Sequence, residues 1–199
     1  MRNSLMAIQI NGNGTITGIS VGGLPDGIVD TDMIAANAVT EAKSTITPGK
    51  VLQIQHASTT TDVEHKDSAS HIFTGLTDDI TPSSTSNNVF VSAVIQYDLY
   101  TANNGQDVGM GFKLTRTVGG TETTLYESDD AYDVYAYTNS GLIENRSHKT
   151  IEFLDTAIST TSAATYKVYA RSYNGANANA IRTQAAGAKS TITLMEIAA

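Results

Sequence analysis

The stretch that decides the fold is NVFVSAVIQYDLY, residues 88–100. Apolar side chains recur at every second position, which is the period of a β-strand. Those on one face are Val89, Val91, Ala93, Ile95, Tyr97 and Leu99. An apolar face of this length predicts a central strand of the hydrophobic core.

The segments on both sides of this strand follow the same period of two. GFKLTRTVGGTETTLYE, residues 111–127, predicts a hairpin because two adjacent glycines allow the positive-φ turn that joins strands directly. DDITPSSTSNN, residues 78–88, is predicted to be a loop. Further strands are predicted at 51–54, 72–76, 149–154, 166–173, 180–183 and 190–197. Together they predict a mainly β protein with a jelly-roll-like β-sandwich, without helical pattern after residue 50.

The N-terminal part has a different character. AIQINGNGTITGIS, residues 7–20, places isoleucines on both sides of an Asn-Gly-Asn-Gly turn and predicts a small hairpin or paired extended segment. One short helix is predicted over 33–43, capped by the Asp or Thr residues before it. This helix is short and thin, so it is marginal alone and suits packing against identical copies. We therefore predict a trimerising segment, 1–48, and a sandwich domain, 49–199.

The composition excludes several classes of protein. Thr (28), Ser (17) and Asn (13) are abundant, and charged residues make up only 16% of the chain, against roughly 25% in an ordinary domain. The net charge of −8 opposes binding to phosphates, so no nucleic-acid partner is expected. Cys is absent, which excludes a disulfide or thiolate. Neither a signal peptide nor an apolar run long enough to span a membrane is visible, so no membrane association is expected.

Candidate catalytic and metal-binding groups form no familiar motif. The histidines lack HExxH spacing and are interpreted as surface or loop residues: His56, His65, His71 and His148. No nucleophile elbow or phosphate-binding glycine loop occurs. The acidic pairs 78–79 and 129–130, with Asp133 nearby, have the chemistry of a Ca²⁺ site or a glycosidase pair, but also that of ordinary solvated turns. We predict no enzymatic activity, no cofactor and no metal site.

The segment DDAYDVYAYTNSG, residues 129–141, is a predicted loop that gathers three tyrosines. Tyr rings stack on sugar rings, and Asp and Asn hydrogen-bond to sugar hydroxyls. The candidate receptor- or glycan-binding residues are Tyr132, Tyr135, Tyr137, Asp129, Asp130 and Asn139. The alternative is that Tyr135 and Tyr137, at strand spacing, pack in the sandwich or between subunits. A second group, Tyr166, Tyr169 and Tyr173, is interpreted as core or interface packing.

Two regions resemble a known family. GTITGISVGGLPDGIVDTDMIAANAVTEAK, residues 14–43, resembles the lead segment of tail-fibre-like structural proteins of marine and freshwater phages, cyanophages especially. TGLTDDITPSSTSNNVFVSAVIQY (74–97), TTSAATYKVYAR (160–171) and STITLMEIAA (190–199) are similar to the β-rich C-terminal domain that often follows. The resemblance implies a bacteriophage virion structural protein, commonly a tail fibre, with a trimeric jelly-roll-like head.

On this resemblance, residues 1–48 would trimerise the chain and attach it to other virion proteins on the exterior of the particle. The residues expected to do so are Ile16, Ile19, Ile28, Val29, Ile34 and Val39. The sequence shows no long repetitive shaft, so two placements stay open: a tail fibre that binds host-surface polysaccharide, and a capsid decoration, cement, head or neck fibre. A third hypothesis, a polysaccharide-cleaving tailspike, is least favoured because such proteins usually need a larger domain with carboxylates in a long groove.

Overall fold

The computed structural model describes residues 9–10, 16–17, 49–66, 70–102, 106–139 and 141–199 of the chain. The chain divides into two units, Met1–Ile46 and Thr47–Ala199, which are described separately. In the first unit, β1 (Gln9–Ile10) pairs antiparallel with β2 (Ile16–Thr17), which confirms the predicted pairing of this segment. The helix predicted over 33–43 lies outside the described residues.

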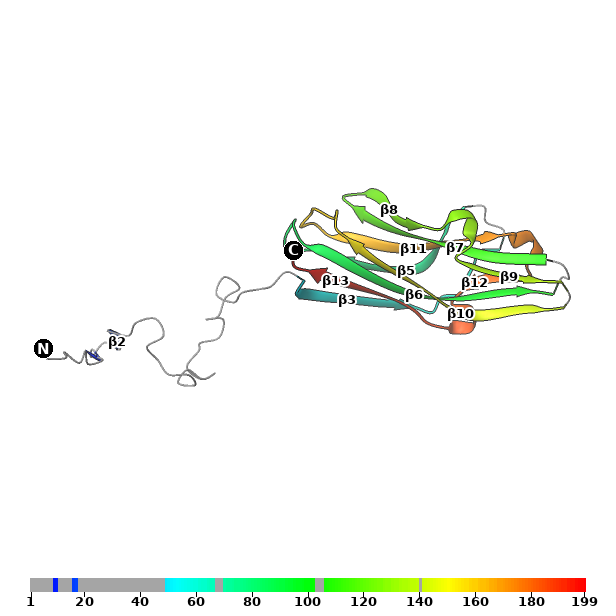
Figure 1. Ribbon diagram of the computed structural model, residues 1–199, viewed down its shortest axis with the longest axis horizontal. Helices are drawn as coiled ribbons and strands as arrows, with labels where there is room; N and C mark the ends of the chain where they lie inside the picture. Colours follow the sequence, from blue (N-terminus) through cyan, green and yellow to red (C-terminus); the bar gives the residue numbers. More distant parts are fainter. Residues whose placement is uncertain (1–8, 11–15, 18–48, 67–69, 103–105, 140) are drawn as a thin grey trace, which may run out of the picture. The chain divides into compact units, whose positions relative to one another are not determined.

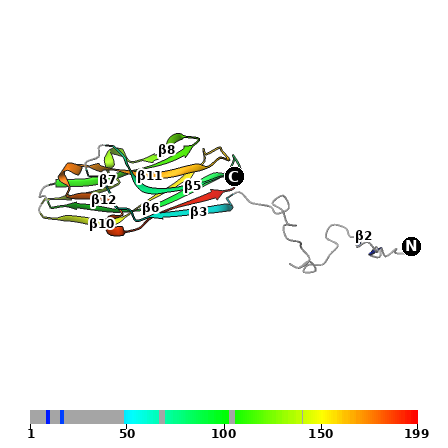
Figure 2. The ribbon, with the colours of Figure 1, turned by 180° about the vertical axis from the view of Figure 1, so that it is seen from behind.

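The second unit consists of two antiparallel β-sheets stacked face to face (Figures 1 and 2). The first sheet contains β3 (Val51–Thr59), β4 (Val63–Glu64), β6 (Asn88–Thr101), β10 (Ile143–Asp155), β12 (Ala180–Thr183) and β13 (Ser190–Ile197). The second contains β5 (Ile72–Ile80), β7 (Gln106–Val118), β8 (Thr121–Glu127), β9 (Val134–Thr138) and β11 (Ala164–Tyr173).

The strand pairing is nested along the chain. β3 pairs with β13, β5 with β11, β6 with β10, and β7 with β8. β13 also pairs with β6, and β11 with β7, so the main strands are ordered β3-β13-β6-β10 in one sheet and β5-β11-β7-β8 in the other. A long hairpin rolled into two sheets in this order is a jelly roll. The predicted fold class of the sandwich is confirmed.

The core lies between the two sheets and is centred on β6. This strand is flanked by β10 on one side and by β12 and β13 on the other. All six residues of the apolar face predicted from the sequence are buried. From the opposite sheet, Phe112, Tyr166 and Val168 are fully buried against this core. The prediction of a central strand is confirmed, and so is core packing for Tyr166.

The predicted hairpin of β7 and β8 is also confirmed. Its two-residue connection has φ of +57° at Gly119 and +83° at Gly120. Both values lie in the left-handed region, which matches the twist of a two-residue hairpin turn and favours glycine over other residues.

A cluster of buried polar groups joins the two sheets. Arg116 of β7 donates to both carboxylate oxygens of Asp155 of β10, at 2.7 and 2.6 Å. The Tyr166 hydroxyl donates to the same carboxylate at 2.8 Å. Asp155 is almost completely buried, so these bonds compensate for the loss of its hydration.

The loop predicted over 78–88 is shorter in the structure, where only residues 81–87 connect β5 to β6. Asp78 to Ile80 continue β5, because Ile80 reaches the core and is buried. The connection from residue 81 onward is held by Glu196, which accepts hydrogen bonds from the Ser83 backbone (2.6 Å) and the Asn87 amide (2.6 Å). Burial alone would raise the pKa of Glu196, but these and other donors outweigh it, and the pKa is lowered.

His65, interpreted as a surface or loop residue, follows β4 outside any strand but does not lie on the surface. Its side chain is fully buried, and its Nε2 lies 3.1 Å from the Thr183 hydroxyl of β12. Burial lowers its pKa from 6.5 to about 4, and a backbone hydrogen bond with Ala170 and the charge of Asp62 offset this only in part. His65 therefore stays neutral at physiological pH.

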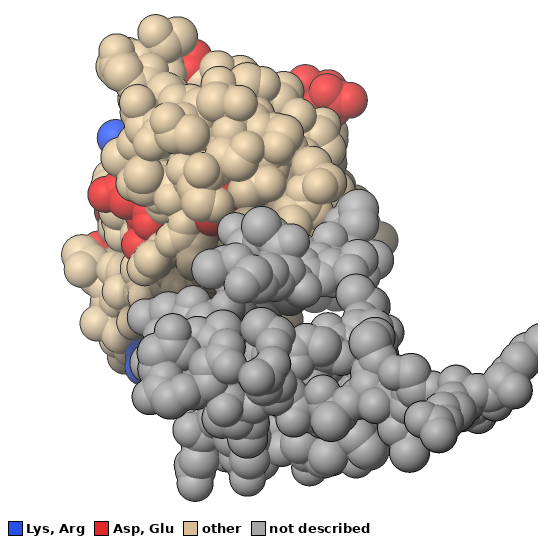
Figure 3. Space-filling view, turned by 90° about the vertical axis from the view of Figure 1, so that its left-hand side faces the viewer, with Lys and Arg blue, Asp and Glu red and all other residues tan. Residues whose placement is uncertain are grey.

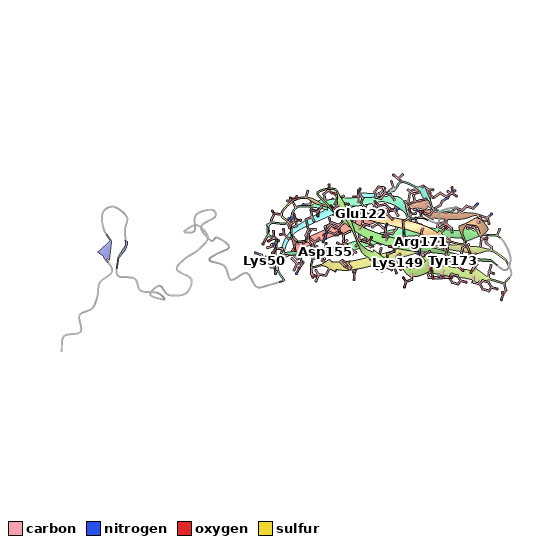
Figure 4. All side chains as sticks on the ribbon, turned by 90° about the horizontal axis from the view of Figure 1, so that it is seen from above. Lys50, Glu122, Lys149, Asp155, Arg171 and Tyr173 are labelled. Carbon is pink, nitrogen blue, oxygen red and sulfur yellow. The ribbon has the colours of Figure 1, made fainter. Side chains whose placement is uncertain are left out.

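The two ends of the sandwich differ. At one end, Gly49 donates to Ala198 (2.7 Å) and Ala198 donates to Lys50 (2.9 Å), so the first and last residues of the domain lie together. The visible part of this end is mostly uncharged, with scattered carboxylates (Figure 3). Tyr173 lies toward the opposite end from Lys50 (Figure 4).

Among the described residues, no helix is long and apolar enough to cross a membrane.

Candidate functional site

The predicted tyrosine segment is not a simple loop. Asp129–Ala131 form a 3-10 turn, η3, and residues 134–138 form strand β9, which pairs with the start of β7. Tyr132 lies between them, and Tyr135 and Tyr137 lie on β9. The three side chains are 47%, 46% and 55% exposed, so Tyr135 and Tyr137 do not pack inside the sandwich, and their packing between subunits stays a prediction.

Two glycines of β7 let η3 pack directly on the strand backbone. Val108, Met110 and Phe112 point into the core, which places Gly109 and Gly111 on the opposite face. A Cβ at Gly111 would lie 2.1 Å from the Ser128 hydroxyl and 2.4 Å from the Cα of Ala131. Any side chain at this position would therefore displace η3.

Gly109 lies in the sheet between two of the three tyrosines whose rings meet here. In the sheet it is paired with Tyr135 of β9 on one side and with Tyr173 of β11 on the other. The ring of Tyr132 contacts both, with centroid distances of 4.5 Å to Tyr173 and 5.5 Å to Tyr135. We call the rings of Tyr132, Tyr135 and Tyr173 the tyrosine platform.

The polar groups at the platform come from β7 and from the turn after β11. The Asp107 carboxylate accepts hydrogen bonds from the Tyr135 hydroxyl (3.2 Å) and from the Asn174 amide. Asp107 is also paired in the sheet with Tyr137, whose hydroxyl donates to Asn139. The Asp107 carboxylate therefore lies beside the rings and is hydrogen-bonded to one of them, Tyr135, and to the neighbouring Asn174.

The hydroxyls of Tyr132 and Tyr135 remain protonated at physiological pH. The pKa of Tyr132 is raised to about 12, first by a hydrogen bond with Tyr173 and further by partial desolvation and the negative charge of Asp107. Desolvation and the hydrogen bond to Asp107 also raise the pKa of Tyr135. These hydroxyls are therefore neutral hydrogen-bonding groups.

Asp133 lies between Tyr132 and β9 and anchors this segment to the rest of the domain. Its carboxylate accepts hydrogen bonds from the Phe112 backbone (2.9 Å), the Tyr126 hydroxyl and the Lys149 ammonium group (2.8 Å). Burial alone would raise the pKa of Asp133, but these donors outweigh it and the pKa is lowered. This carboxylate positions β9 and is not free to bind a ligand.

The other predicted candidates are not members of the tyrosine platform. Asp129 and Asp130 are exposed on η3, and Asn139 is exposed after β9. Ile16 lies in β2. Ile19, Ile28, Val29, Ile34 and Val39 lie outside the described residues. The roles of all these residues stay predictions.

The sequence interpretation missed three members of the site. Tyr173 had been assigned to core or interface packing, and Asp107 and Asn174 had no assignment. The available signal was the alternation Val108-Gly109-Met110-Gly111, in which small residues interrupt the outer face of a strand whose inner face is apolar. Such glycines indicate that something packs closely on the strand.

The described residues contain no group of three or more His, Asp or Glu side chains that could hold a metal ion. A surface depression of about 510 Å³ is lined by Gln96, Arg146, Ser147, His148 and residues 185–188. The Gln96 amide is hydrogen-bonded to the backbone of Tyr97 and Ala185, and Arg146 is paired with Asp98 at 3.2 Å. These polar groups hold the fold, and the tyrosine platform is the stronger candidate site.

Comparison with known proteins gives matches in structure only. No protein-family model matches the chain, and no curated protein matches it in sequence. One similar solved structure is the VP2 subviral particle of infectious bursal disease virus, with a TM-score of 0.39, 12% identity, and coverage of 74% of this chain and 33% of that chain. Another is the Gx strain of infectious bursal disease virus, with a TM-score of 0.35, 11% identity, and coverage of 74% and 38%. The chain thus spans about a third of the length of the first structure.

Proposed function

We propose that this protein is a non-enzymatic bacteriophage virion structural protein. It forms a short homotrimeric fibre on the exterior of the particle, most simply a tail fibre that contributes to host-surface recognition. Residues 1–48 attach it to other virion proteins, and the jelly roll projects outward. The sequence resemblance of residues 14–43 to phage fibre proteins supports the assignment to a virion.

The observation that carries host recognition is the position of the tyrosine platform. Two half-exposed aromatic rings, Tyr132 and Tyr135, pack with the partly buried ring of Tyr173 beside a carboxylate, and they form a surface suited to binding rather than to the core. Tyr173 lies toward the end of the domain opposite Lys50, where residues 1–48 join (Figure 4). A domain attached at Lys50 would present the platform to a partner. Three such sites on a trimer, and many trimers on a particle, raise avidity without tight single contacts.

An apolar row across the first sheet supports self-association. In register, Ile54 of β3 pairs with Met195, Met195 with Phe90, and Phe90 with Leu154 of β10. Ile54 is 57% exposed and Leu154 48%. The row is continuous with Val51, two residues after Gly49, where residues 1–48 join. Copies held together by that segment would meet through this row and bury it, as expected of a closed oligomer.

Host recognition is tested with the full-length chain, fluorescently labelled and mixed with a panel of bacteria and their extracted surface polysaccharides. We expect saturable binding to one host and inhibition of phage adsorption by the free protein. The triple variant Tyr132→Ala, Tyr135→Ala, Tyr173→Ala should lose this binding, whereas Tyr169→Ala, on the same strand as Tyr173, should keep it. A folded chain that binds no host cell and does not block adsorption would refute the adhesin role.

The place on the virion is tested by immunogold labelling of intact particles. A tail fibre predicts label at the tail. Label distributed over the head, with particles lacking the protein adsorbing normally but losing thermal stability, would replace the adhesin role by capsid decoration.

The homotrimer is tested by sedimentation equilibrium at micromolar concentration. We expect a mass three times that of the 21.0 kDa chain. Ile54→Lys together with Leu154→Glu should weaken association, whereas Thr150→Lys, an exposed outer-face position of β10 away from the row, should not. A wild-type mass near one chain refutes the trimer.

A further inference from the structure

We propose that the tyrosine platform binds uncharged saccharides, with a neutral hexopyranose as the contacted unit, and discriminates against uronic, phosphorylated and sialylated sugars. This inference rests on the proposed recognition function, because it names the chemical class that the same site would take. It is carried by the ring geometry and by the position of Asp107.

The platform offers an open apolar surface rather than an enclosed cage. The ring planes are inclined by 40° between Tyr132 and Tyr173 and by 60° between Tyr132 and Tyr135. Their centroids are close enough for the rings to contact one another, so a quaternary ammonium group cannot be enclosed between them. An outer surface of inclined rings, of which Tyr132 and Tyr135 are half-exposed, instead matches the C–H face of a pyranose.

The hydrogen-bonding group beside the rings accepts protons. An ionised carboxylate has acceptor sites for about four hydrogen bonds, and Asp107 uses two of them for Tyr135 and Asn174. The remaining sites suit sugar hydroxyls, which donate. A sugar carboxylate or phosphate at that position carries no proton to donate at neutral pH, so the match is lost.

The local charge also opposes anions. Asp107 is the charged residue that contributes to the raised pKa of both Tyr132 and Tyr135, so its field reaches both hydroxyls. The nearby Lys149 is engaged elsewhere, because its ammonium group is bound to Asp133 at 2.8 Å. The chain as a whole carries −8, which adds to the repulsion of an anionic ligand.

The test compares sugar pairs that differ by a single carboxylate. Binding of methyl β-D-glucopyranoside and methyl β-D-galactopyranoside to the full-length chain is measured by saturation-transfer NMR titration, beside the matching uronic acid glycosides, with choline as a cationic probe. One unit of charge repulsion at this exposed site predicts about fourfold weaker binding, or more, for the uronides at low ionic strength.

Variants separate charge from shape. Asp107→Asn keeps the size but removes the charge and about half of the acceptor sites, so it should weaken binding of the neutral sugars and reduce the discrimination between neutral and uronic sugars to within about twofold. Tyr132→Ala with Tyr173→Ala should abolish binding of both classes, and Tyr169→Ala should leave binding unchanged. Near-ultraviolet circular dichroism of each variant verifies that it is folded.

Two results would overturn the inference: uronides that bind as tightly as their neutral partners, or choline binding in preference to every sugar. A chain that binds host cells through the platform but none of these neutral sugars would overturn the inference and leave the proposed function standing. A chain that binds neutral sugars but never binds host cells would overturn the proposed function and leave the sugar specificity of the platform standing.

Discussion

Acidification should destabilise the sandwich through His65. This side chain is fully buried, and burial lowers its pKa from 6.5 to about 4. In the unfolded chain the imidazole is hydrated and titrates near its ordinary pKa of 6.5. Between these two values the unfolded chain binds a proton that the folded chain does not. The free energy of unfolding is therefore unaffected by His65 above pH 6.5 and falls as the pH decreases toward 4.

The size of this effect follows from the shift. A change from 6.5 to about 4 corresponds to about 3 kcal/mol when it is fully expressed, because each pKa unit is equivalent to 1.36 kcal/mol. At about pH 4.5 we expect about 2.5 kcal/mol of it to be lost. Domains are typically stable by roughly 5–15 kcal/mol, so one buried imidazole would remove a sizeable fraction.

The assay is urea denaturation of the wild type and His65→Gln, followed by far-ultraviolet circular dichroism between about pH 7.5 and 4.5. Protein concentration is held constant because self-association shifts apparent stability. The wild type should lose about 2.5 kcal/mol more than the variant over this range. Exposed His148, changed to Gln, should behave as the wild type. The lowered pKa values of Asp133 and Glu196 act at lower pH and equally in all three chains. Parallel pH profiles for the wild type and His65→Gln would refute the reasoning.

Three further predictions concern single residues. Gly111→Ala should displace η3, lower stability by about 1–3 kcal/mol in urea denaturation, and remove sugar binding together with the platform. Asp155→Ala leaves Arg116 buried without its partner and should cost about 3–5 kcal/mol, whereas Tyr166→Phe, which removes one neutral donor, should cost about 1 kcal/mol; equal losses would contradict the ion-pair argument. Gly119→Val should lower the thermal midpoint by more than Gly119→Asn, because Asn tolerates φ of +57° far better than a β-branched residue.

The parts of the fold that the sequence predicts are those decided locally. The alternation in residues 88–100 is visible without any partner strand, and two adjacent glycines fix the turn of the β7–β8 hairpin. The positions of β12 and β13 also agree with their predicted ranges. In each case the pattern spans a few neighbouring residues, and the observed strand or turn agrees with it.

Features decided by distant partners were not predictable in this way. β10 begins at Ile143, six residues before its predicted start, because Glu144 to His148 are polar on both faces and become a strand by pairing with β6. His65 lies in a polar segment and is buried only because β12 and β11 close over it. Neither event leaves a local pattern.

The candidate site shows the same division. Tyr132 and Tyr135 could be selected from the sequence because they occur together in one segment. Tyr173 could not, because its approach to them requires β9 and β11 to flank β7 at Gly109. Asp107 joins through the same strand order. The platform is thus a product of topology as much as of composition.

The nested pairing of strands also governs how the chain can fold during synthesis. β3 is the first strand of the sandwich to leave the ribosome, but its partner β13 is the last, and β5 must likewise wait for β11. Folding dominated by such distant pairings is slow, and unpaired strand edges meanwhile remain available to other chains. The nascent domain therefore cannot complete the second sheet before β11 or the first sheet before residues 190–197 have emerged, and a chain that ends before residue 190 lacks the strand that joins β3 to β6.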